Sequence, residues 1–438
     1  MPHYIPDGAL AQAKEHKTAL LAIGGGLVGL RAAVLLYRWR SNRSTKHKPG
    51  TFDLSAGSIA SKDAADEFSA YLSKYNTLER GDGAEAKLGD AARVAAFVDK
   101  FYSLVTDLYE WGWGTSFHFS PALPGKGWPE AEAAHEARAG AILGVGPGDR
   151  VLDVGCGVGG PMRTVAASSG AHVVGITINE YQVSRARRHN ERLGVAAQCT
   201  PVRGNFLAMP FEDASFDGAY AMEATCHADR LENVYREVFR VLKPGASFVT
   251  YEWVATPDYD PGNRAHVALM DEIVIGNGLP AMHTQQEAED AGRAVGFRLV
   301  RSRDLARAPR DSVAPFWLGE GLIPRDNGTA KDRVNPWYAR LSKNRRALKA
   351  MAAVNGACVS LAEALRLAPK GSREIHDLLA LTALALSDAG EIGIFTPMHM
   401  LVFQKPKEEE EEEEKKVEVE EKKEAEKPEK EAEKEAEQ

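Results

Sequence analysis

The stretch with the clearest chemical potential is VLDVGCGVGG, which runs from Val151 to Gly160. Aliphatic and β-branched residues lead into it and predict a buried strand, and the glycines predict a tight turn that opens a helix. Glycines in such a turn let the backbone approach a ligand closely at the carboxyl end of the strand. Asp153 lies two residues before the first glycine of the turn, where a carboxylate can hold the amino group of a methionine moiety.

Two other interpretations of this turn compete. A dinucleotide site shares the pattern GxGxxG, but Asp153 would repel a pyrophosphate. The next expected strand, HVVGITIN, ends in Thr177 and Asn179, where a nicotinamide-dependent enzyme places an acid. A turn with a purely structural role is the third interpretation. The residues favour S-adenosylmethionine as the cofactor.

Further residues follow in the order that a class I methyltransferase requires. We expect Gln182 to meet the ribose hydroxyls, Asn205 to hydrogen-bond the adenine amino group, and Phe206 to pack on the adenine ring. The predicted cofactor site consists of Asp153, Gly155, Cys156, Gly157, Gly159, Thr177, Gln182, Asn205 and Phe206.

A second chemically distinctive segment, DLYEWGWGTSFHF, occupies residues 107–119. Aromatic side chains alternate here with small residues, and Glu110 and His118 lie among them. An aromatic cage that handles a flat, apolar cation is one interpretation; an aromatic core segment with glycine kinks is the other. Under the first interpretation Glu110 is desolvated, its pKa is raised, and it acts as a proton acceptor or counter-charge, with His118 as the competing base.

The elements that must position these residues alternate between strands and helices. From residue 150 to about 253, short β-branched runs such as FDGAYAM and SFVTYEW alternate with helical stretches. This alternation predicts an α/β fold, a Rossmann-like parallel sheet with helices on both faces. Residues 265–405 form a second α+β region that ends in the strand-like IFTPMHMLVF.

An apolar segment of about 20 residues, 18–37, precedes this body and contains one charge, Arg31. A helix of that length spans a bilayer core of roughly 30 Å. More basic residues follow the segment than precede it, which predicts that the catalytic body faces the cytosol. We therefore expect an N-terminal transmembrane helix, with a signal or transit peptide as the alternative.

Charge and cysteines exclude several classes of protein. The last 32 residues contain 17 Glu and 8 Lys and contribute −9 to the net charge of −8, so the remaining body is near neutral and no nucleic-acid partner is expected. The Glu/Lys tail is expected to be disordered or a single exposed helix. The four cysteines have no metal-ligand spacing, so no metal site is expected.

Seven motifs together resemble the sterol 24-C-methyltransferases of plants, algae and fungi: YEWGWGTSFHF, LDVGCGVGGPMR, NEYQV, MEATCHA, REVFRVLKPG, YEW and IFTPM. The resemblance covers roughly residues 65–405. The aromatic and MEATCHA motifs are specific to that family, whereas many methyltransferases share the glycine motif.

The resemblance implies transfer of a methyl group to carbon 24 of a sterol side-chain alkene, with a cycloartenol-like acceptor favoured. The alkene is the nucleophile; a carbocation forms, a hydride shifts, and a base removes a proton. Residues expected to act in catalysis are Asp107, Tyr109, Glu110, His118, Glu223 and His227. Residues expected to bind the sterol are Trp111, Trp113, Phe117, Phe119, Glu252 and Trp253.

The chain departs from the family pattern at four places. Val274 precedes IGNGLP where the family often has an acid, and Asn205 replaces an acid before Phe206. The segment after the aromatic motif, PALPGKGWPEAEAAHEA, matches the family only loosely, and the Glu/Lys tail is not an expected family feature. Two alternatives to this function remain. One is another lipid-directed methyltransferase, of the tocopherol, phosphobase or cyclopropane-synthase type. The other is a non-catalytic sterol-binding membrane protein.

The expected organisation has five parts, and the resemblance suggests the endoplasmic reticulum membrane and a possible homo-oligomer. The parts are an anchor and linker (1–62), a helical segment with the aromatic motif (63–126), the methyltransferase core (127–264), a C-terminal sterol-methyltransferase region (265–406) and the tail (407–438).

Overall fold

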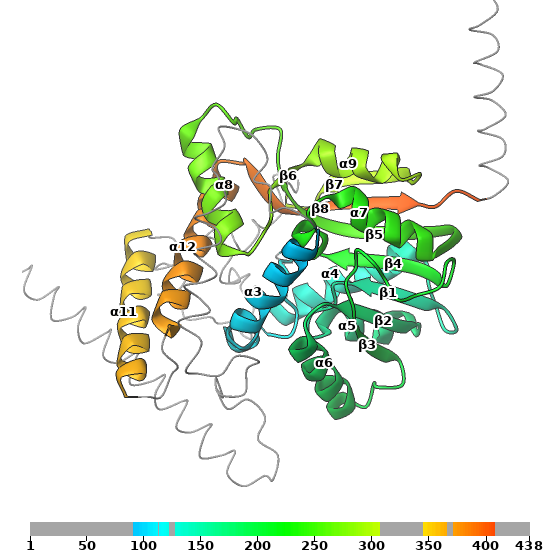
Figure 1. Cartoon of the computed structure of the whole chain (residues 1–438), viewed down its shortest axis with the longest axis horizontal. Helices are drawn as coiled ribbons and strands as arrows, with labels where there is room; N and C mark the ends of the chain where they lie inside the picture. Colours follow the sequence, from blue (N-terminus) through cyan, green and yellow to red (C-terminus); the bar gives the residue numbers. More distant parts are fainter. Residues whose placement is uncertain (1–90, 113, 122–127, 307–344, 366–370, 408–438) are drawn as a thin grey trace, which may run out of the picture.

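The computed structural model describes residues 91–112, 114–121, 128–306, 345–365 and 371–407 (Figure 1). One eight-stranded sheet organises them, in the order β3-β2-β1-β4-β5-β8-β7, with β6 paired to β5. Its strands are β1 Arg150–Val154, β2 His172–Thr177, β3 Cys199–Arg203, β4 Phe216–Met222, β5 Leu242–Ala255, β6 His283–Thr284, β7 Arg298–Asp304 and β8 Phe395–Gln404.

The first five strands are parallel, and β8 runs antiparallel to both β5 and β7. The parallel strands bring their carboxyl ends to one edge of the sheet, where open α/β sheets bind ligands. The prediction of a Rossmann-like α/β fold is confirmed.

Helices cover both faces, because neighbouring residues of each strand point in opposite directions. Val151 packs with α4 (Trp128–Leu143) and α5 (Gly160–Ser169), and Leu152 packs with α7 (Leu231–Val241) and α9 (Gln285–Ala294). A further helix, α6 (Glu180–Leu193), lies against β3 and β2.

In the described residues after 264, every strand belongs to the same sheet as the methyltransferase core. The strands β7 and β8 of this region complete the methyltransferase sheet, with Tyr251 of β5 opposite Met400 of β8. The helices of the same region, α8 (Arg264–Gly276), α11 (Arg345–Ala364) and α12 (Ser372–Glu391), gather beside the sheet with α3 (Ala91–Gly112) (Figure 1).

The helix α3 crosses the carboxyl edge of the sheet and carries the first part of the aromatic segment (Figure 1). Its residues Val94, Phe97 and Phe101 pack with Ile375 of α12 and with the end of α8. The C-terminal helices therefore hold α3 over the edge where the glycine turn lies.

From Ala350 onward the exposed face of α11 is apolar, the reverse of an ordinary surface helix, although Lys349 just before it is also exposed. Two polar residues of α11 lie toward α12: Arg373 Nη1 donates to Ser360 Oγ at 3.2 Å, and the backbone amide of Arg373 donates to Glu363 Oε1 at 3.0 Å. From Ala350 onward, the exposed residues of α11 and of the residue after it are Ala350, Ala353, Val354, Ala357, Cys358, Leu361, Ala364 and Leu365.

Among the described helices, none combines the length and the apolar character needed to cross a membrane. The predicted transmembrane segment, residues 18–37, lies outside the described residues, as do Trp113 and residues 408–438 of the tail.

Candidate active site

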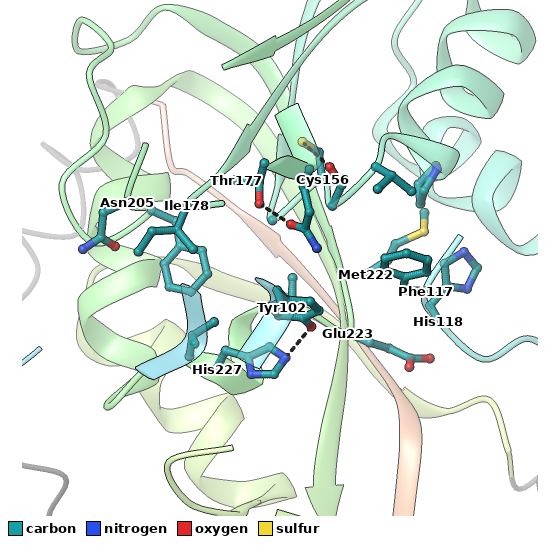
Figure 2. A pocket seen from close by; sticks show the side chains of 18 of the residues that line it. Tyr102, Phe117, His118, Cys156, Thr177, Ile178, Asn205, Met222, Glu223 and His227 are labelled. Carbon is teal, nitrogen blue, oxygen red and sulfur yellow. Dashed lines mark hydrogen bonds between the residues drawn. The ribbon is translucent and has the colours of Figure 1, made fainter. Parts of the chain in front are cut away.

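A cavity opens at the carboxyl ends of β1, β2 and β4, beneath α3 (Figure 2); its empty space of about 820 Å³ includes volume that is open to solvent. The predicted cofactor residues that line the cavity are Gly155, Cys156, Gly157, Thr177, Gln182, Asn205 and Phe206. The structure therefore brings together seven residues that are spread over 52 positions of the sequence.

The glycine turn is fixed by the neighbouring strand. The amides of Gly155 and Cys156 both donate to the carbonyl of Ile176 at 2.9 Å. Gly155 and Gly157 have φ values of +84° and +52°, which disfavour any residue with a Cβ. A Cβ on Gly155 would also collide with Ala224, so the turn needs glycine for both conformation and space.

The polar wall of the cavity is held in place from three elements. Thr177 Oγ1 donates to Gln182 Oε1 at 2.7 Å, and Gln182 Nε2 donates to Thr106 Oγ1 of α3 at 3.3 Å. Asn205 Oδ1 accepts from the amide of Leu207 at 2.9 Å. A glycine cradle, polar side chains and the ring of Phe206 together fit a methionine, a ribose and an adenine, so these residues would hold S-adenosylmethionine.

Two predicted cofactor residues do not line the cavity. Gly159 caps α5 with a φ of +80°. Asp153 lies under the turn with 2% of its surface exposed, and its Oδ2 atom has no hydrogen-bond partner among the described residues. Burial raises the pKa of Asp153 to about 7. A direct contact of Asp153 with the cofactor stays a prediction.

The second half of the aromatic segment packs against the glycine motif. A Cβ on Gly160 would collide with Thr115 and Ser116, so the two motifs are in direct contact. Phe117 lines the cavity, and its ring meets that of Tyr109 edge-on at 5.4 Å. Phe119 is buried against Trp253, with ring centroids 5.8 Å apart, and does not reach the cavity.

Glu110 lies in an ion-pair cluster rather than in the cavity. Its carboxylate accepts from Arg185 Nε at 2.6 Å and from His189 Nε2 at 2.7 Å, both on α6. Burial alone would raise the pKa of Glu110, but these two partners outweigh it and lower the pKa. The expectation of a raised pKa is therefore wrong, and Glu110 joins the end of α3 to α6.

His118 lines the cavity, but both of its ring nitrogens carry a hydrogen, so neither has a lone pair that could accept a proton. Its Nε2 donates to Glu136 Oε1 and its Nδ1 to the carbonyl of Phe119, both at 2.9 Å, and neither partner can donate in return. Burial lowers the pKa of His118, but the hydrogen bond and charge of Glu136 outweigh it and raise the pKa to about 9. The interpretation of His118 as a base is corrected to that of a buried cation.

Glu223 is the buried carboxylate of the cavity. It follows β4 with a φ of +54°, a rare conformation for a residue with a side chain, and backbone strain of this kind clusters at functional sites. Its oxygens accept from the amide of Phe119 and from Trp253 Nε1, each at 2.7 Å. Burial raises the pKa of Glu223 to about 8, despite these two hydrogen bonds.

His227 lines the same cavity and is hydrogen-bonded to a residue that the sequence did not reveal. Its Nε2 is 2.8 Å from the hydroxyl of Tyr102, and its Nδ1 is 3.2 Å from the carbonyl of Gly278. Figure 2 shows Tyr102 and His227 joined in this way, with Phe117 and His118 elsewhere on the wall. Burial lowers the pKa of His227 to about 4, so the ring is neutral.

The remaining predicted residues do not reach the cavity or lie outside what the structure describes. Glu252 is buried on β5, where its Oε1 accepts from Thr225, Tyr235 and Thr250. Trp253 acts on the cavity through Glu223. The side chains of Asp107 and Trp111 are outside the described part of the chain.

Sequence reasoning missed Tyr102 and Glu136. Tyr102 precedes Tyr109 by seven residues on the same helix, a spacing that places both on one face and could have pointed to it. Glu136 had no such signal, because only the tertiary fold brings α4 to the aromatic segment. Within the described ranges, no group of three or more His, Cys, Asp or Glu side chains is placed to hold a metal ion.

Two protein-family models match the chain. The one described as "Methyltransferase domain" matches residues 152–250, and the one described as "Sterol methyltransferase C-terminal" matches residues 346–407.

Curated relatives match most of the chain. 24-Methylenesterol C-methyltransferase 2 of Oryza sativa subsp. japonica is 45% identical over 392 residues, which is 90% of this chain and 99% of the relative. Its namesake of Arabidopsis thaliana is also 45% identical, over 81% of this chain and 89% of the relative. Squalene methyltransferase 1 of Botryococcus braunii is 44% identical, over 87% and 94%. The chain therefore belongs to the sterol C-methyltransferase family of S-adenosylmethionine-dependent enzymes.

Proposed function

We propose that the enzyme transfers the methyl group of S-adenosylmethionine to carbon 24 of a sterol side-chain alkene. The observation that carries this proposal is the shared cavity, in which the cofactor residues meet Glu223, His227, Tyr102 and Phe117. The names of the rice and Arabidopsis relatives support a sterol acceptor. Two acceptors are to be compared: a cycloartenol-like alkene, which would be methylated at carbon 24, and a 24-methylene sterol, which would be methylated at the methylene carbon attached to carbon 24.

This chemistry suits the residues of the cavity. When bound, S-adenosylmethionine supplies a methyl group on a positively charged sulfur. The alkene of the acceptor is the nucleophile, so no nucleophilic Ser or Cys is needed. After transfer, the side chain carries a positive charge, which migrates by a hydride shift and is discharged by loss of a proton. The protein must exclude water and stabilise a cation.

Glu223 is suited to stabilise that cation. Its two hydrogen-bond donors fix the carboxylate, and its buried position strengthens electrostatic interactions. A cation brought into the cavity lowers the pKa of a neighbouring carboxyl. Glu223 is thus proposed to be ionised when the cofactor and the acceptor are bound, and to act as their counter-charge. The ring of Phe117 adds a π face to the same cavity.

A second candidate function is methylation of a linear triterpene alkene. Squalene methyltransferase 1 and botryococcene C-methyltransferase of Botryococcus braunii are each 44% identical to this chain. The same cavity chemistry applies to both acceptor classes, because each offers an alkene carbon as the nucleophile.

Competition between acceptors tests the proposal. The full-length enzyme is incubated with labelled S-adenosylmethionine and an equimolar mixture of a cycloartenol-like sterol, a 24-methylene sterol and squalene. We expect the label in one or both sterols. Label in squalene alone would establish the second candidate, and binding of sterol without any transfer would indicate a non-catalytic protein.

We also propose that the enzyme is anchored in the endoplasmic reticulum membrane with its catalytic body in the cytosol. The apolar segment 18–37 and the basic residues after it support the anchor. The outward face of α11 supports a second contact with the lipid surface, because its exposed residues are apolar over about four turns. A sterol acceptor is itself a membrane lipid, so this contact would keep the enzyme beside its substrate.

A further inference from the structure

Tyr102 and His227 form a hydrogen-bonded chain that ends at the backbone. The Tyr102 hydroxyl is 2.8 Å from His227 Nε2, and His227 Nδ1 is 3.2 Å from the carbonyl of Gly278. The histidine is buried with 7% of its surface exposed. Both side chains line the cavity that holds Glu223 and the glycine turn.

The carbonyl of Gly278, at the end of this series, determines which atom donates in each of the two hydrogen bonds. The carbonyl of Gly278 cannot donate, so Nδ1 of His227 carries a hydrogen. Because burial keeps the imidazole neutral, Nε2 has a lone pair and accepts the hydrogen of the Tyr102 hydroxyl. The lone pairs of Tyr102 Oη remain available to a group in the cavity.

The hydrogen bonds from Tyr102 through His227 to Gly278 also give a role to the motif IGNGLP, which has none in the cofactor site. Gly278 belongs to IGNGLP, which follows Val274. It has a φ of +66°, and a Cβ there would lie 2.8 Å from the ring of Phe101. Glycine at this position therefore lets the loop after α8 come close to α3, and its carbonyl reaches His227.

We infer that Tyr102 is the group that removes the final proton from the methylated sterol cation, with His227 as the base that receives the proton of Tyr102. The inference rests on the proposed function. Tyr102 Oη takes a proton from a carbon next to the cationic carbon, and the electron pair of that C–H bond becomes the new double bond. At the same time the hydroxyl hydrogen of Tyr102 passes to His227 Nε2. The resulting imidazolium keeps its hydrogen bond to Gly278.

The other polar groups of the cavity are less suited to this step. His118 donates from both ring nitrogens and has no lone pair. Each oxygen of Glu223 already accepts a fixed hydrogen bond at 2.7 Å, and we have assigned this carboxylate the role of counter-charge when the cofactor and the acceptor are bound. We therefore assign proton removal to the uncharged pair of Tyr102 and His227, and the role of counter-charge to the carboxylate of Glu223.

Product distribution is the decisive readout, because proton loss follows methyl transfer. We compare Tyr102→Phe, His227→Gln and the double variant with the wild-type enzyme, using labelled S-adenosylmethionine and the sterol that the wild type methylates. Tyr102→Phe keeps the ring and removes only the hydroxyl. We expect methylated product to persist, but with the main alkene reduced at least fivefold relative to other alkene isomers and a water-trapped alcohol. His227→Gln should shift the products in the same direction, and the double variant should add nothing to the larger single effect.

Tyr259→Phe is the matched control, since Tyr259 is half-buried against His266 and does not line the cavity. It should leave the product ratio unchanged. Cofactor affinity by calorimetry and melting curves establish that each variant is folded, and if Tyr102→Phe does not fold, His227→Gln carries the test. An unchanged product ratio in a folded variant overturns the inference, and so does complete loss of methyl transfer. Absence of sterol methylation by the wild type would instead overturn the proposed function.

Discussion

The indole Nε1 of Trp253, on β5, donates a hydrogen bond at 2.7 Å to Oε2 of Glu223, the residue that follows the neighbouring strand β4. The other oxygen of Glu223 accepts from the amide of Phe119, also at 2.7 Å. One buried carboxylate therefore connects three motifs, SFHF, MEATCHA and YEW, that are far apart in the sequence.

Glu223→Gln should reduce turnover on the order of 100-fold or more, because an amide keeps the shape of the side chain but cannot neutralise a cation. Trp253 and Phe119 still find an oxygen acceptor, although only one oxygen remains for two donors. Steady-state kinetics at saturating cofactor, with melting curves alongside, check this. Normal turnover in the folded variant would remove Glu223 from the mechanism.

The cofactor-free protein should lose stability as the pH rises from 7 to 9. Glu223 has a pKa of about 8 in the folded state against an ordinary 4.5, and His118 one of about 9 against 6.5. A group that binds its proton more tightly when folded stabilises the fold below its unfolded pKa, and that contribution is lost as the pH rises through the folded pKa. Melting temperatures measured between pH 6 and pH 9 test the sign.

Glu223→Gln is the control for this pH effect. The variant cannot ionise at residue 223, so its melting temperature should fall less than that of the wild type over the same pH range. If the two proteins show the same slope, burial of Glu223 does not govern the pH dependence.

Glu110→Gln should act on stability rather than on proton removal. The change weakens the contacts with Arg185 and His189 that hold the end of α3 to α6, and it should cost about 1–3 kcal/mol in the free energy of unfolding. Glu191→Gln, at an exposed position of the same α6, should cost far less. Denaturant unfolding and product analysis are measured together. A stable Glu110→Gln protein with an altered alkene ratio would restore Glu110 as a base.

Deletion of residues 1–48 should release most of the enzyme from membranes and leave methyl transfer intact in detergent. The truncated protein should retain weak binding to phosphatidylcholine vesicles through α11, which Leu361→Asp should abolish. Leu193→Asp is the matched control, because Leu193 is 57% exposed, close to the 60% of Leu361, but lies at the end of α6. Flotation assays compare the three proteins. Equal binding by the two aspartate variants would contradict a role for α11, and full retention by the truncated protein would contradict the anchor.

Local patterns in the sequence predicted the fold and the cofactor cradle well. The glycine turn depends on backbone conformation and on the strand before it, both of which are local, and Gly155 and Gly157 have the positive φ values that a close approach requires. The alternation of strands and helices predicted the parallel sheet, because residues such as Val151 and Leu152 must be buried on opposite faces.

The roles of the charged residues were harder to predict, because they depend on partners brought in by the tertiary fold. Glu110 lies among aromatic residues in the sequence, but its partners Arg185 and His189 are 75 and 79 residues away. His118 is likewise fixed by Glu136, which lies in a segment that matches the family only loosely. A motif identifies the residue types, whereas the direction of a pKa shift depends on what the fold places beside them.

The position of the transferred methyl group on the sterol distinguishes C-methylation of the side chain from methylation at any other site. The full-length enzyme is incubated with trideuteriomethyl S-adenosylmethionine and a cycloartenol-like sterol, whose side-chain double bond begins at carbon 24, and the product is analysed by mass spectrometry and NMR. The account predicts one trideuteriomethyl group bonded to carbon 24 and a new double bond in the side chain. A label on the sterol hydroxyl oxygen, or no label in the sterol at all, would contradict it.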